Sequence, residues 1–274
     1  MTVPRPLLGL LLLGLLSNSA PLTAAGSDFR LREHQLALRA PNHADLQAEI
    51  NFGRDIAARV LGRIPLYQDR TVNRYVTLVG RAVALQGNRP ELDYHFAVLD
   101  DEAVNAYSAP GGYIFITRGA LATLKDEAEL AAVLAHEIAH VNLRHIVQRF
   151  RIRGTEDGGI GALGRLLGAS GDTARIAFAQ AVDQAMTLLF ETGFNQSDEL
   201  EADAEATLML AAAGYDLTAL RRYLTRVGEN PERRGKTHPT SRARLSALDR
   251  LINGQGLAGL DFPTAAERFR THVR

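Results

Sequence analysis

Residues Asp126–Val147 read DEAELAAVLAHEIAHVNLRHIV and contain the pentapeptide HEIAH at His136–His140. Asp126, with a glutamate three residues later, is typical of a helix N-terminus, so we expect one long helix to about Val147. Histidines four residues apart lie on one face of a helix, where two neutral imidazoles can bind one Zn²⁺. The glutamate between them, Glu137, can act as general base on a metal-bound water. The stretch therefore predicts a zinc hydrolase site.

A catalytic zinc usually has three protein ligands and one water, so the two histidines need a partner. His145 lies about 140° round the expected helix from His140 and is better explained as a packing or surface histidine. Glu199 and Asp203 are stacked at i and i+4 on a second expected helix, where they can supply a carboxylate ligand and an acceptor for a histidine N–H. Glu201 points away from them. The alternative is an ordinary solvated acidic face.

The composition excludes several classes of function. Lys and Arg together number 31, as do Asp and Glu, so the formal net charge is zero and a nucleic-acid role is not expected. Cysteine is absent, so thiol catalysis, disulfides and cysteine-bound zinc are excluded. Any metal in this chain must be held by nitrogen and oxygen atoms.

The rest of the chain reads as a predominantly helical α+β protein with a small β-sheet beside the HEIAH helix. Hydrophobic periodicity predicts further helices over 44–62, 71–85, 173–191, 197–213, 217–227 and 241–251, and strands over 92–99, 104–107 and 113–117. The glycine-rich stretch 153–171 is expected to be a loop, which either acts as a lid or membrane contact or is a plain connector.

The N-terminus predicts export. Arg5 is followed by the apolar run Leu7–Leu16 and by small and polar residues that end in Thr23-Ala24-Ala25. This is the pattern of a secretory signal peptide over residues 1–25, and the apolar run is short for a membrane span. The alternative is an uncleaved membrane anchor. We expect residues 26–274 to form a single exported domain.

Four ordered blocks resemble the M48 family of zinc metallopeptidases. They are Asn105–Thr117 (NAYSAPGGYIFIT), His136–His140, Glu199–Asp203 with the pattern E-x-x-x-D, and Thr237–Pro239 (THP) with Arg244 at the family's spacing. The resemblance implies a zincin-like metallopeptidase domain that holds one zinc ion per chain.

The resemblance also implies a role for each matching residue. His136, His140 and Glu199 are the expected zinc ligands, Glu137 is the expected catalytic base, and Asp203 is expected to support a ligand histidine. The family often has Ser-Arg shortly before the ligand glutamate, where this chain has Asn195–Gln196. The interaction that this arginine makes in the family is therefore not expected in this chain.

Two more parts of the chain are candidates for the catalytic machinery. His238 is a candidate to donate a hydrogen bond to the oxyanion or to act as a fourth zinc ligand that keeps the enzyme latent; the alternative is a histidine with no catalytic part. The predicted strand with Tyr113, Ile114, Phe115 and Ile116 is expected to be an edge strand that pairs with an extended peptide substrate. The alternative is a plain core strand.

The resemblance implies a zinc endopeptidase that degrades misfolded or misassembled envelope proteins in the periplasm. Its expected partners are protein or peptide substrates and the outer-membrane assembly machinery, with at most peripheral membrane contact. A second hypothesis is a chaperone-like binding module for outer-membrane protein assembly. A third is another class of zinc hydrolase, such as an amidase.

Overall fold

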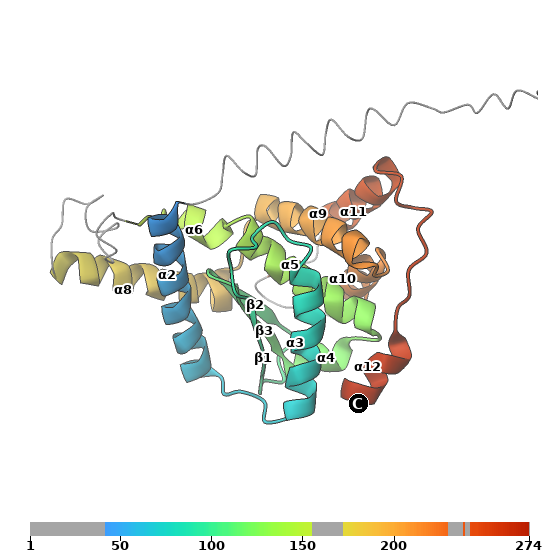
Figure 1. The fold of residues 1–274 in the computed structure, drawn as a ribbon, viewed down its shortest axis with the longest axis horizontal. Helices are drawn as coiled ribbons and strands as arrows, with labels where there is room; N and C mark the ends of the chain where they lie inside the picture. Colours follow the sequence, from blue (N-terminus) through green and yellow to red (C-terminus); the bar gives the residue numbers. More distant parts are fainter. Residues whose placement is uncertain (1–41, 155–171, 230–237, 239–241, 274) are drawn as a thin grey trace, which may run out of the picture. The chain divides into compact units, whose positions relative to one another are not determined.

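The computed structural model describes residues 42–154, 172–229, 238 and 242–273, and Pro41–Arg274 form one compact unit (Figure 1). The predicted signal peptide over 1–25 and most of the predicted loop over 153–171 lie outside the described residues. The extent of the predicted domain, 26–274, stays a prediction.

The described residues are mostly helical and include a small sheet, which confirms the expected fold class. In chain order the elements are α2 (His43–Arg63), α3 (Arg70–Ala84), β1 (His95–Leu99), β2 (Ala106–Ala109), β3 (Tyr113–Thr117), α4 (Arg118–Thr123), α5 (Glu127–Asn142), α6 (His145–Arg149), α8 (Asp172–Thr187), the π-helix η1 (Leu188–Thr192), α9 (Gln196–Ala213), α10 (Ala219–Glu229), α11 (Arg242–Gly254) and α12 (Ala266–Val273).

The sheet has the strand order β1-β3-β2, with β1 parallel and β2 antiparallel to β3. The turn between β2 and β3 is Pro110-Gly111-Gly112, where both glycines have positive φ angles of 76° and 92°. Because L side chains rarely adopt such angles, the glycine pair permits this tight reversal. The reversal brings Ala109 opposite Tyr113 and fixes the register of the pair.

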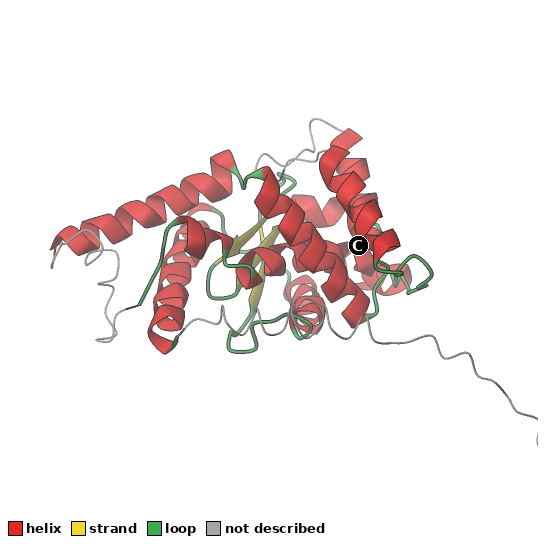
Figure 2. Ribbon diagram, turned by 90° about the horizontal axis from the view of Figure 1, so that it is seen from above, coloured by secondary structure: helices red, strands yellow, loops and turns green. Residues whose placement is uncertain are grey.

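Both faces of the sheet are covered by helices (Figure 2). Val98, Ile114 and Ile116 belong to a buried cluster with the apolar residues of α3 and α5. The alternate residues Tyr107 and Phe115 belong to a second cluster with α2 and α8. The alternation along each strand therefore places α5 against one face and α2 against the other.

The expectation that Tyr113–Thr117 is an edge strand is wrong. This segment is β3, which lies between β1 and β2 and pairs with a strand on both sides. Its apolar run, with Ile114 and Ile116 almost completely buried, is that of a central strand covered on both faces. The alternative, a plain core strand, is correct, and β2 is the edge strand next to α5.

The expected single helix up to Val147 is divided into α5 and α6. Arg144 separates them in a left-handed conformation with φ of 58°. Its Nε lies 3.1 Å from Oε2 of Glu49, a completely buried carboxylate of α2. A tertiary ion pair thus accompanies a break that the helical pattern of the sequence does not indicate. The break also changes the direction in which the side chain of His145 points.

Gly53 fixes the distance between α2 and the turn at Pro110. A Cβ atom on Gly53 would lie 1.6 Å from the carbonyl oxygen of Pro110, so only glycine fits this position.

Within the described part of the chain, no helix combines the length and the hydropathy that a membrane span requires.

Candidate metal centre

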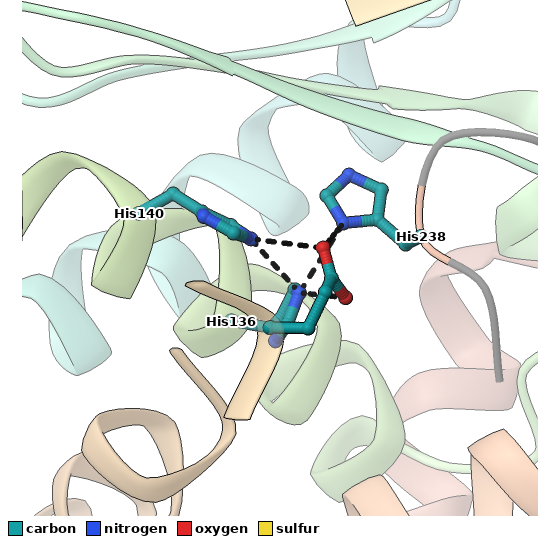
Figure 3. A group of neighbouring side chains, drawn as sticks. His136, His140 and His238 are labelled. Carbon is teal, nitrogen blue, oxygen red and sulfur yellow. Dashed lines mark hydrogen bonds and ion pairs between the residues drawn. The ribbon is translucent and has the colours of Figure 1, made fainter. Parts of the chain in front are cut away.

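His136 and His140 lie on the last turns of α5, a helix whose residues are all buried. Asp126 caps its N-terminus, where Oδ1 accepts a hydrogen bond of 2.9 Å from the backbone N–H of Glu129. The four-residue spacing brings the two Nε2 atoms to 3.1 Å from each other. Figure 3 shows the two rings directed toward a common point, which His238 approaches from another segment.

Helix α9 packs across α5 and brings a carboxylate to the same point. The Oε2 atom of Glu199 lies 3.5 Å from Nε2 of His136, and Oε1 lies 3.6 Å from Nε2 of His140. Both Glu199 and Asp203 are only 1% exposed, whereas the side chain of Glu201 is 65% exposed. The alternative of a solvated acidic face is therefore wrong for the pair at i and i+4.

His238 completes the group of donor atoms. Its Nδ1 lies 2.9 Å from Oε1 of Glu199 and 3.4 Å from Nε2 of His136. Its Nε2 lies 3.5 Å from Oε1 of Glu137. The ring thus stands between the carboxylate of α9 and the carboxylate expected to act as the base.

These atoms fit a metal ion. The candidate ligand atoms of His136, His140, Glu199 and His238 all lie within 4.8 Å of one another. A tetrahedron with zinc bonds of about 2.0–2.1 Å has edges of about 3.3 Å. The distances given above, from 2.9 to 3.6 Å, are close to that edge. A set of three imidazoles and one carboxylate is also a donor set that zinc accepts.

A buried ion-pair network holds two of the donors in place. Asp203 Oδ1 lies 3.0 Å from Nδ1 of His136, so it can accept that N–H and direct Nε2 toward the site. Arg244 of α11 donates to both oxygens of Asp203, and its Nη1 lies 2.5 Å from Oε2 of Glu199. Arg244 itself is 1% exposed.

The second histidine is held by contacts that sequence reasoning missed. His145 Nδ1 lies 2.8 Å from Nδ1 of His140, and the ring of Phe194 stacks on His140 with a centroid distance of 3.9 Å. His145 is buried, so the packing interpretation is correct and the surface interpretation is wrong. Because the contact depends on the break at Arg144, the helical pattern alone could not have indicated it.

The pKa values follow from burial and the network. Burial alone would lower the pKa of His136, but hydrogen bonds to Asp203 and Glu199 raise it to about 9. Burial and the neighbouring His136 hold the pKa of His140 well below its ordinary value. Burial opposes the charge of Glu199, but the histidines around it keep its pKa far below the usual range. The network therefore favours an ionised Glu199 and a neutral His140, the forms that bind a metal, whereas His136 must release a proton when a metal binds.

Glu137 has its own support on β2. The Oγ atom of Ser108 lies 2.8 Å from Oε2 of Glu137, and both side chains are almost completely buried. Ser108 lies on the face of β2 that is directed toward α5, because it alternates with Tyr107 on the opposite face. Apart from the position of Ser108 in the block Asn105–Thr117, no pattern of residues in the sequence indicates this contact.

The departure at Asn195–Gln196 has a local structural consequence. Asn195 is the N-cap of α9, and its Oδ1 accepts a hydrogen bond of 2.9 Å from the backbone N–H of Asp198. Asparagine is a favoured N-cap residue, so it starts the helix that carries Glu199.

Comparisons with known proteins show a family and several relatives. The model of peptidase family M48 matches residues 70–252. The putative beta-barrel assembly-enhancing protease of Vibrio cholerae serotype O1 is 28% identical over 212 residues, which cover 73% of this chain and 43% of the relative. The beta-barrel assembly-enhancing protease of Escherichia coli K12 is 27% identical over 206 residues, which cover 72% and 42%.

A mitochondrial protein is also similar. The metalloendopeptidase OMA1 of Schizosaccharomyces pombe is 26% identical over 223 residues, which cover 76% of this chain and 62% of the relative. The chain thus spans about two fifths of the length of the two bacterial relatives and about three fifths of the yeast relative.

Proposed function

The chain belongs to peptidase family M48, and on that premise we propose that it is a zinc-dependent endopeptidase that degrades misfolded or misassembled envelope proteins in the periplasm. The observation that carries the proposal is the convergence of the buried side chains of His136, His140 and Glu199, from two helices, next to Glu137. In this proposal the first three residues hold one zinc ion per chain.

Held by His136, His140 and Glu199, a zinc ion would supply a Lewis acid that polarises the scissile carbonyl and acidifies a water molecule. Glu137 accepts the proton from that water and passes it to the leaving amine. Ser108 donates a hydrogen bond to Oε2 of Glu137 and so holds the carboxylate in one orientation. Asp203 fixes the tautomer of His136, and Arg244 keeps Asp203 and Glu199 in place.

His238 is proposed as a fourth donor in the conformation described above. Its Nδ1 faces Glu199 and His136, which favours the latent-ligand role over that of a donor to the oxyanion. In this role His238 must leave before a substrate carbonyl can take its place. Replacement by alanine is then expected to raise the rate of cleavage, whereas loss of an oxyanion donor would lower it.

The substrate strand is proposed on β2 in place of β3. β2 is at the edge of the sheet, and no strand among residues 42–154, 172–229, 238 and 242–273 pairs with its outer side. Ser108 of this strand contacts the proposed catalytic base. A peptide added along β2 would be held by main-chain hydrogen bonds, which depend little on the side chains of the substrate.

The class of substrate and the location rest on similarity and on the N-terminal pattern. The two bacterial relatives named above are beta-barrel assembly-enhancing proteases, and residues 1–25 have the pattern of a signal peptide. We therefore propose unassembled outer-membrane proteins as substrates, and the outer-membrane assembly machinery as a partner.

Replacement of Glu137 by glutamine separates the peptidase from the chaperone-like binding module. The substrates are casein and an unfolded outer-membrane β-barrel protein, and Glu201→Gln is the matched control on an exposed glutamate. We expect Glu137→Gln to keep its metal and to cleave at least about 100-fold more slowly, because general-base catalysis contributes about 10²–10⁴-fold. If Glu137→Gln cleaves as fast as the control, Glu137 is not the base; if no form cleaves but all prevent aggregation, the binding module is correct.

A further inference from the structure

Helix α3 carries positive charge that no acidic residue of the same helix balances. Its sequence, RTVNRYVTLVGRAVA, contains three arginines and neither aspartate nor glutamate, although the whole chain is neutral. These arginines, Arg70, Arg74 and Arg81, are all exposed, and none of them forms an ion pair within the described part of the chain. Their charge is therefore available to a partner outside the chain.

Two leucines stand on the same face of α3 as the arginines. Leu78 is 58% exposed and Leu85 is 81% exposed. The helical repeat of about 100° per residue places five side chains within about 80° of arc, and we call them the α3 stripe: Arg70, Arg74, Leu78, Arg81 and Leu85. The valines of α3 lie on the opposite side, in the core. The stripe thus plays no part in the packing of the protein itself.

An open groove of about 700 Å³ lies beside the first half of the stripe, between α3 and α12 (Figure 1). The residues that line it are Arg70, Thr71, Arg74, Tyr75, Leu78 and His272. The ring of His272 stacks on Tyr75 with a centroid distance of 4.5 Å, and its Nδ1 lies 2.8 Å from the backbone oxygen of Arg268. The wall of the groove on α12 is therefore held in place.

The groove suits an anion of the size of a phosphate group. Two guanidinium groups and one hydroxyl group line it, and its lining residues include no carboxylate. Asp69 precedes them as the N-cap of α3, and its Oδ1 accepts hydrogen bonds from the backbone N–H groups of Thr71 and Val72. Guanidinium groups bind phosphate oxygens through paired hydrogen bonds.

The mixture of arginines and leucines indicates which kind of anion binds. A soluble acidic peptide would pair with the arginines but leave Leu78 and Leu85 in water. A purely apolar partner would remove the hydration of the arginines without compensation. The surface of an anionic membrane meets both requirements, because its phosphate groups attract arginines and its acyl chains lie directly below them.

We propose that the α3 stripe and the adjacent groove dock the protein on an anionic phospholipid membrane. A lipid phosphate occupies the groove between Arg70 and Arg74, and Leu78 and Leu85 enter the region of the acyl chains. The contact is peripheral. It goes beyond the proposed peptidase function and does not require catalysis.

The test is co-sedimentation of the purified protein with vesicles of phosphatidylcholine alone and with vesicles that also contain phosphatidylglycerol. The protein should bind the second kind only, and high salt should release it. Each arginine near an anionic surface strengthens binding about fivefold. The triple variant Arg70→Gln/Arg74→Gln/Arg81→Gln should therefore bind on the order of 100-fold more weakly.

A matched triple variant removes the same charge from other elements. Arg54 of α2, Arg149 of α6 and Arg250 of α11 are exposed, and they form no ion pair within the described part of the chain. Arg54→Gln/Arg149→Gln/Arg250→Gln should keep most of the binding. All forms carry the same N-terminus, so a difference between the two triple variants reports on α3.

The leucines are tested without a change of charge. Leu78→Gln/Leu85→Gln should weaken binding to the phosphatidylglycerol vesicles about tenfold or more, because apolar side chains that leave water contribute on this scale. Ile176→Gln/Leu260→Gln is the matched control, since these residues are 58% and 48% exposed and lie outside α3. The control should bind like the unsubstituted protein.

Three results would overturn the proposal: no binding to either kind of vesicle, equal binding to both, or equal losses in the two triple variants. If soluble polyglutamate binds and the vesicles do not, the stripe docks an acidic protein segment and the membrane assignment is wrong. Cleavage of casein should be the same in all forms. A protein that binds the vesicles as described but cleaves nothing would refute the proposed peptidase function and leave the docking surface in place.

Discussion

Arg244 donates two hydrogen bonds to the carboxylate of Asp203, with Nε–Oδ2 at 2.7 Å and Nη2–Oδ1 at 2.6 Å, and both residues are only 1% exposed. The fork geometry of the guanidinium fixes the plane of the carboxylate. Because Asp203 in turn faces Nδ1 of His136, α11 determines the orientation of a histidine on α5. The third nitrogen of Arg244 reaches Glu199.

Arg244→Gln should weaken zinc binding about 10–100-fold, because residues that orient metal ligands contribute on this scale. It should also lower the free energy of unfolding by about 3–5 kcal/mol, since it leaves two buried carboxylates without their cation. Competition with a chelator measures the first effect, and urea unfolding measures the second.

Arg221→Gln is the control for Arg244→Gln. Arg221 of α10 pairs with Asp249 of α11, the helix that also carries Arg244, but both side chains are more than 40% exposed. Loss of such a pair costs about 0–1 kcal/mol and should leave zinc binding unchanged. Equal effects of the two substitutions would contradict the role given to Arg244.

Ser108→Ala should lower kcat about tenfold with little change in KM. The hydroxyl orients Glu137 through a hydrogen bond to a carboxylate, and such bonds contribute about 1.5–3 kcal/mol. Ser108→Thr keeps the hydroxyl and should restore part of the rate. A purely structural role for Ser108 would instead lower the melting temperature and leave the kcat of the folded fraction unchanged.

Gly53→Ala should lower the free energy of unfolding by about 3 kcal/mol or more, because its Cβ would collide with the backbone of Pro110. Gly62→Ala on the same helix is the matched control, since a Cβ there meets no atom within 4 Å. That substitution should be stabilising by about 0.4–1 kcal/mol. Chemical denaturation compares the two, and a tolerated alanine at residue 53 would contradict the packing of α2 on the turn.

Glu127 should make the free energy of unfolding of the metal-free protein depend on pH in the acidic range. It accepts hydrogen bonds from the hydroxyl groups of Tyr75, at 2.6 Å, and Tyr215, at 2.8 Å, and it pairs with Arg268 of α12. Burial would raise its pKa, but these partners outweigh burial and lower the pKa. Its contribution to stability is therefore complete above its unfolded-state pKa of about 4.3 and lost as the pH falls through the lower folded pKa.

The difference in unfolding free energy between the unsubstituted protein and Glu127→Gln should accordingly be constant from pH 7 to about 5 and shrink below the unfolded-state pKa. Urea unfolding in the presence of a chelator measures it. Glu102→Gln is the control, because Glu102 pairs with Arg118 at a side-chain exposure of 82%. A difference that stays constant down to pH 3 would contradict the lowered pKa.

The sequence indicated the local parts of the site because they depend on spacing within one helix. The four-residue spacings of His136 with His140 and of Glu199 with Asp203 hold in the structure, and β3 has the predicted bounds Tyr113–Thr117. These features need only the helical repeat and β-branched composition. The order of strands in the sheet is a tertiary property, so β3 was wrongly expected at the edge.

Contacts between distant segments were not predictable from one sequence. The break at Arg144 accompanies an ion pair with Glu49, 95 residues earlier, and after this break His145 lies next to His140. The helix α12 was not expected, and it joins Glu127 through Arg268, 141 residues later. Such pairs have no spacing signature, because the fold and not the local repeat brings them together.

The zinc content of three purified forms of the protein tests the proposed metal centre most directly. Elemental analysis after removal of loosely bound metal should give about one zinc ion per chain for the unsubstituted protein. Glu201→Ala, which removes the exposed glutamate of α9, should keep this value, and Glu199→Ala should lose it. Zinc that is retained without Glu199 but lost without Glu201 would contradict the ligand set proposed above.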